Sequence, residues 1–155
     1  MTTVFDLVLA LHNVVRWIVL IAAVLASLAM LQGWLGKRPW AARDRQLGLL
    51  FVITMDIQTL LGLILYVRYL TLLPGGLAIA MGNPGLRFFA MEHAVTMVLA
   101  LVLVHLGQVL SRRRQLDQAK FRIGAICFGL ATLLILAGIP WPWLSYGRSL
   151  LPTLG

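Results

Sequence analysis

Four long apolar stretches constrain the fold more than any other feature of the sequence. They cover approximately residues 5–35, 47–70, 87–110 and 122–139, and each reaches the roughly 17 to 25 residues with which a helix crosses a bilayer. A soluble domain normally has about a quarter of its residues charged, whereas this chain of 155 residues is 12% charged and 61% hydrophobic. We therefore predict an all-α integral membrane protein, with residues 1–155 forming a single domain, a four-transmembrane-helix bundle.

The basic residues predict how this bundle is oriented. Nine of the 13 Lys and Arg residues lie in or beside the first and third connecting segments, and the remaining four are Arg16, Arg68, Arg87 and Arg148. Short basic loops stay in the cytoplasm, so we expect two cytoplasmic basic loops and both termini outside. Contacts with anionic lipid headgroups explain the basic runs, and no nucleic-acid partner is indicated.

The outer side of the predicted bundle carries a loop and aromatic residues. The second connecting segment, "TLLPGGLAIAMGNPG", has the Gly and Pro content of a loop, and either an ordered flap or an unstructured connection fits it. Four tryptophans flank the ends of spans and are expected to anchor the protein at the membrane interfaces: Trp34, Trp40, Trp141 and Trp143.

Ionisable and amide side chains inside the spans are the strongest indications of function. Each ionisable group near the bilayer centre costs at least about 2.5 to 3.5 kcal/mol, so it needs a partner, water or a ligand. The single Cys127 excludes a multi-cysteine metal site. The polar groups within the predicted spans that we select as candidates are His12, Arg16, Asp56, Gln58, Glu92, His93 and His105.

Two of these histidines are candidate ligands of a b-type haem. At about 1.5 Å per residue, His12 in the first span and His93 in the third both fall in the outer third of the bundle. A b-type haem takes an axial imidazole on each side of its iron, and Arg16 and Arg87 would be the cations for its propionates. Alternatively, the polar groups hold helices together, with Arg16 and Glu92 forming an ion pair between the first and third spans.

Asp56, Gln58 and His105 lie deeper in the predicted bundle, whereas Glu92 lies next to His93. We expect Asp56, Gln58, Glu92 and His105 to form a proton-handling or quinone-headgroup site. A structural carboxyl is the alternative interpretation of Asp56. A hydrogen bond within the bundle is one alternative for His105, and a second haem held together with Met30 is another.

Five segments carry a resemblance to a family of proteins. The chain resembles small four-span bacterial membrane proteins of the kind found in Bacteroidetes and commonly labelled "cytochrome b", in "LHNVVRWIVL", "GWLGKRPW", "DIQTLLGLILY", "RFFAMEH" and "IPWP". The matching positions include His12, Arg16, Gln58, Gly62, Tyr66, Arg87, Glu92 and His93. The resemblance implies a multi-pass protein of the bacterial inner (cytoplasmic) membrane and favours haem b as its cofactor.

These observations leave two functional classes open. The first is a membrane electron-transfer protein with one haem near the outer face, exchanging electrons with quinol. The second is a non-catalytic accessory subunit of a larger respiratory or photosynthetic complex, packed among partner chains and lipids. No nucleophile–base constellation predicts a hydrolase or transferase, so an electron carrier or accessory subunit is favoured over a stand-alone enzyme.

Overall fold

The computed structural model describes residues 3–149, and within that range the only regular structure is helical. The elements are α1 (Val4–Leu35), α2 (Ala42–Thr71), α3 (Gly76–Gly82), α4 (Pro84–Arg87), the π-helical turn η1 (Phe88–Glu92), α5 (His93–Arg112) and α6 (Asp117–Gly138). Four continuous helices are long and apolar enough to cross a membrane: α1, α2, α6 and the helix formed by α4, η1 and α5 together. The predicted all-helical architecture is confirmed, with four helices that could span a membrane. The prediction that both termini lie outside concerns residues 1–2 and 150–155, which are not among the described residues.

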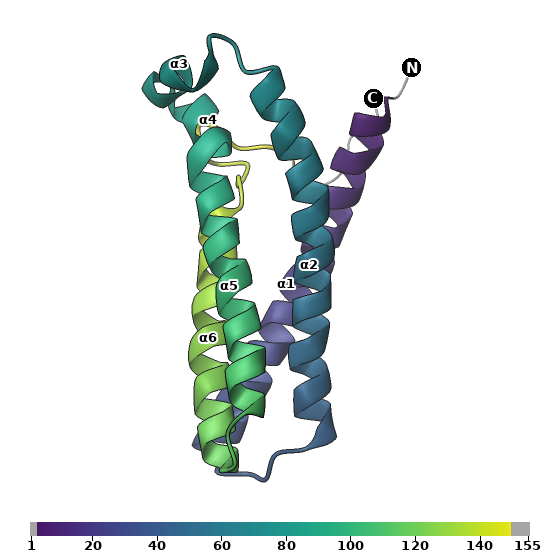
Figure 1. Ribbon diagram of the computed structural model, residues 1–155, viewed down its shortest axis with the longest axis vertical. Helices are drawn as coiled ribbons and strands as arrows, with labels where there is room; N and C mark the ends of the chain where they lie inside the picture. Colours follow the sequence, from purple (N-terminus) through teal and green to yellow (C-terminus); the bar gives the residue numbers. More distant parts are fainter. Residues whose placement is uncertain (1–2, 150–155) are drawn as a thin grey trace.

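The four long helices run side by side along the length of the molecule (Figure 1). Helix α1 packs against α2 and α6, and α5 packs against α6 and α2. This ring order places α1 and α5 diagonally across the interior of the bundle. Side chains of α1 and α5 that point inward can therefore meet only at its centre.

Small and aromatic residues fill the interior of the bundle. Ala22, Ala23 and Ala26 of α1 are buried, as expected for small residues that let helices approach closely. Ser27 shares a 2.9 Å hydrogen bond with Thr132 of α6. The largest fully buried rings are those of Phe51, Phe121 and Phe128.

Helices α2 and α6 each begin about five residues before the apolar runs that predicted them. The prediction placed their first residues at 47 and 122, whereas the helices begin at Ala42 and Asp117. The added first turns are polar, so hydrophobicity marks only the part of each helix that faces lipid. Polar contacts with the first connecting segment hold these turns in place.

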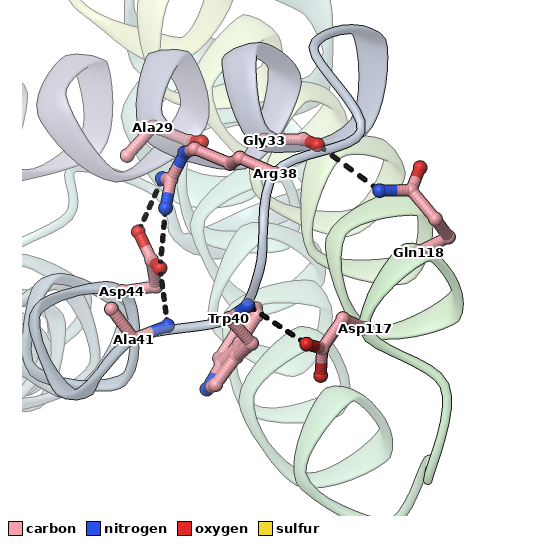
Figure 2. Close-up of polar contacts among 8 residues, drawn as sticks. All are labelled: Ala29, Gly33, Arg38, Trp40, Ala41, Asp44, Asp117 and Gln118. Carbon is pink, nitrogen blue, oxygen red and sulfur yellow. Dashed lines mark hydrogen bonds and ion pairs between the residues drawn. The ribbon is translucent and has the colours of Figure 1, made fainter.

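The segment between α1 and α2 is fastened to both helices by Arg38 and Asp44 (Figure 2). Arg38 donates to the Asp44 carboxylate, with an Nη1–Oδ2 distance of 2.8 Å, and to the carbonyl of Ala29 at 3.3 Å. Asp44 is fully buried and also accepts the amide hydrogen of Ala41 at 2.9 Å. The hydrogen bond with Asp44 raises the pKa of Arg38 above its usual value.

The same segment is also attached to the start of α6 (Figure 2). The amide of Trp40 donates to Asp117 at 2.9 Å. Beside this contact, Gln118 of α6 donates to the carbonyl of Gly33, in the last turn of α1, at 3.4 Å. The Trp40 ring packs on Phe121, with centroids 4.8 Å apart. Trp40 thus packs against the bundle core, in addition to its expected position near an interface.

The loop between α2 and the third span is ordered. It contains the short helix α3, whose Ala80 is buried in a small cluster with Leu73 and Ala90. Asn83 caps the next helix by accepting the amide hydrogens of Gly85 and Leu86. Of the two interpretations of this loop, the structure agrees with the ordered flap.

Candidate functional site

A π-helical turn immediately precedes His93. In a π-helix the hydrogen bonds join residues five apart, and Arg87 and Glu92 are five apart in the sequence. The Nε of Arg87 donates to the Glu92 carboxylate at 2.7 Å, and both side chains are about half exposed. The sequence led us to expect an ion pair between Glu92 and Arg16. In the structure the Glu92 carboxylate binds Arg87 of the same continuous helix.

His12 and His93 meet across the interior of the bundle. Their ring centroids are 6.5 Å apart and their planes are inclined by 67°. His12 lies on α1 and His93 is the first residue of α5, so each histidine comes from one of two diagonally opposed helices. Only a pair placed at the same depth and turned toward the bundle axis can reach this separation.

His93 is oriented by the end of α6. Its Nδ1 lies 2.7 Å from the carbonyl oxygen of Gly138, the last residue of α6. The last carbonyls of a helix have no partner within the helix, so this oxygen is available to a side chain. Because a carbonyl only accepts, Nδ1 carries the hydrogen, and Nε2 of a neutral His93 has a free lone pair. Histidines that bind metals are oriented in the same way.

His12 is positioned by two residues of α2. The amide nitrogen of Gln58 donates to the His12 carbonyl at 3.1 Å and lies 3.2 Å from the ring Nε2. A β-carbon added at Gly62 would lie 3.2 Å from Cε1 of the ring, so the glycine gives His12 its space. Nδ1 of His12 and Oε1 of Gln58 are buried without a hydrogen-bond partner.

Gln58 therefore belongs with the histidine pair and does not share a site with Asp56. Residues two apart on a helix do not face each other, which is why the two side chains diverge. The sequence prediction grouped Asp56, Gln58, Glu92 and His105, and the structure separates this group. Only Asp56 and His105 remain in contact.

Two arginines lie within electrostatic range of His93: Arg16 and Arg148. Arg16 is 8% exposed, and its guanidinium lies 5.6 Å from the centroid of the Trp17 ring. Arg148 is exposed and lies 4.2 Å from the centroid of the Phe89 ring. The predicted Arg87 is engaged by Glu92.

Two imidazoles from opposed helices are the side chains that would hold a haem iron. Rings that bound one iron from both sides would have their centroids about 6 Å apart, and the centroids of His12 and His93 are 6.5 Å apart. The buried Nδ1 of His12 and Oε1 of Gln58, which lack partners, show that the cluster is not satisfied by protein alone. Coordination through Nε2 of His12 requires the Gln58 amide to leave that nitrogen, while its hydrogen bond to the His12 carbonyl can persist.

A second polar pair lies between α2 and α5. Nε2 of His105 is 3.4 Å from Oδ1 of Asp56, and both side chains are about half exposed. Met30, the alternative partner of His105, is fully buried beside Gly124 of α6. His105 and Met30 thus face different helices and do not form a ligand pair.

The described part of the chain, residues 3–149, holds no group of three or more His, Cys, Asp or Glu side chains that could bind a metal ion. Comparisons with protein-family models, with curated proteins and with solved structures find no match to this chain.

Proposed function

We propose that this chain is a membrane electron-transfer protein that holds one b-type haem between α1 and α5. The observation that carries the proposal is the approach of His12 and His93 to 6.5 Å across the bundle interior. The hydrogen bond from His93 to Gly138 and the resemblance to membrane proteins labelled "cytochrome b" support it further.

The residues of the site would have distinct roles. His12 and His93 would hold the haem iron through their ring nitrogens, and Arg16 and Arg148 would be the cations for its propionates. Gln58 would position His12 by donating a hydrogen bond to the backbone carbonyl of His12. When bound, the haem supplies one-electron exchange at its iron, and the apolar bundle sets its potential by burying it.

The proposal includes an orientation and a location. The basic residues gather where α1 and α5 end and where α2 and α6 begin, which favours this end of the bundle as the cytoplasmic one. The histidine pair would then lie near the outer face of a bacterial inner membrane. Electron partners of this kind include a quinol in the bilayer and a subunit of a larger respiratory or photosynthetic complex.

A redox difference spectrum of the purified full-length protein tests the haem. We expect a b-type α-band in the reduced-minus-oxidised spectrum and about one haem per chain by pyridine haemochrome assay. His12→Ala and His93→Ala should each lower the haem content at least tenfold, because each removes one axial ligand.

Ser27→Ala is the matched control for these variants. It removes a half-buried polar contact between α1 and α6 without touching the histidines, and should keep the full haem content. A colourless protein that co-purifies in fixed ratio with an oxidase or reaction centre would contradict the electron-carrier proposal and support the accessory-subunit alternative.

A further inference from the structure

Asp56 and His105 form a polar pair on the lipid-facing surface between α2 and α5. Asp56 lies 14 residues after the first residue of α2 and 15 before its last, so it is at the middle of a span. Its side chain is 46% exposed and that of His105 is 45% exposed. Two ionisable groups in this position cost free energy in lipid unless something polar approaches them.

The hydrogen-bond chemistry of the pair is defined by its neighbours. Nδ1 of His105 lies 3.0 Å from the carbonyl of Leu101 and must therefore donate its hydrogen to that oxygen. Nε2 then faces the Asp56 carboxyl, 3.4 Å from its Oδ1. The half-exposed carboxyl can still exchange a hydrogen bond with a molecule on its lipid side.

The surroundings of the pair are apolar. One turn before and after Asp56 and His105, the exposed side chains are those of Ile53, Leu60, Val102 and Val109. An occupant therefore needs an apolar body and a small uncharged head that accepts or donates hydrogen bonds. A phospholipid does not fit, because its charged phosphate stays at the membrane interface. Quinones have carbonyl oxygens that accept and, when reduced, hydroxyls that donate.

We propose that Asp56 and His105 bind the headgroup of a membrane quinone. This inference rests on the proposed function in one respect, since the quinone would be the electron partner of that protein. Binding itself needs no haem: His93 and His105 are 12 residues apart on α5, which separates the two sites by about 18 Å along the helix.

Photolabelling of the full-length protein in lipid nanodiscs tests the site. The probe is a short-tailed azidoquinone, and labelled peptides are mapped by mass spectrometry. We expect label on the peptides that contain Asp56 and His105, displaced by excess unlabelled quinone. The double variant Asp56→Leu/His105→Leu should lose at least nine-tenths of this label. Replacing both partners by apolar residues leaves no unpaired charge, so the variant should keep its helical circular dichroism.

Ile53→Leu/Val109→Leu is the matched control, because it alters the lipid-facing neighbours and leaves the pair intact. Label that is spread over all spans, or that persists in the double variant, overturns the proposal. So does a double variant that converts a dimer into monomers with its labelling unchanged, which would make the pair a contact between copies. The haem spectrum of the same samples is read separately, so that failure of either proposal is recognised by itself.

Discussion

At the scale of single residues, the sequence identified His12 and His93 as candidate site residues but not the groups that orient their rings. Ionisable residues within apolar runs are conspicuous, so His12 and His93 could be selected before their contact was known. The carbonyl of Gly138 has no sequence signal, because every residue has one and only the fold brings it to His93. Arg148 could be counted only as a charge outside the membrane. Gly62 follows Gln58 by one helical turn, and that spacing could have placed it beside His12.

Filling the space at Gly62 should disturb the histidine site. Gly62→Val adds a branched side chain where a β-carbon alone already comes within 3.2 Å of the His12 ring. We expect a loss of about 1 to 3 kcal/mol in stability from overpacking and a severalfold lower haem content. Thermal unfolding in detergent and the haemochrome assay measure the two effects.

Gly129→Val is the control for this substitution, since a β-carbon at Gly129 meets nothing within 4 Å. Both variants replace a helical glycine by the same residue, so differences in helix propensity cancel. Equal unfolding midpoints for the two would show that the space beside His12 does not constrain the ring.

At the scale of helices, hydrophobicity predicted each span but not its polar first turns. Asp44 and Asp117 lie outside the apolar runs and looked like loop residues. Each nevertheless accepts a backbone amide of the first connecting segment, and their helices begin at or near them. Such contacts depend on neighbouring helices, which a single-chain pattern does not reveal. The order of helices around the bundle was likewise beyond the sequence, because all four spans are apolar on most sides.

Removing the Asp44 carboxylate should loosen the end of the bundle where α1 ends and α2 begins. Asp44→Ala deprives Arg38 of its ion pair and the amide of Ala41 of its acceptor, and we expect a loss of about 2 to 4 kcal/mol. Asp44→Asn retains a hydrogen-bond acceptor, so its stability should lie between that of Asp44→Ala and that of the native chain. Lys120→Ala breaks a more exposed pair with Asp117 and should cost less than about 1 kcal/mol. Comparable losses for Asp44→Ala and Lys120→Ala would contradict this ranking, which thermal unfolding measures.

At the scale of the whole molecule, the distribution of charge predicts which end faces the cytoplasm. Cysteine labelling in a Cys127→Ser background tests it, because Cys127 is the only native cysteine. Gly82→Cys in the outer loop should react with a membrane-impermeant maleimide in intact cells. Gln115→Cys, between α5 and α6, should react only after lysis. Both positions are exposed, so the reverse pattern of labelling would invert the proposed orientation.

The π-helical turn η1 sets the rotation, about the helix axis, of the residues before it relative to those after it. An α-helix advances about 100° per residue, so deleting one residue from Phe88–Glu92 would rotate the loop that contains α3 around the helix axis relative to His93. The four spans, their hydrophobicity and their charges would be almost unchanged. A relative one residue shorter in this turn would thus look the same by composition and yet present a different face to the opposite helix.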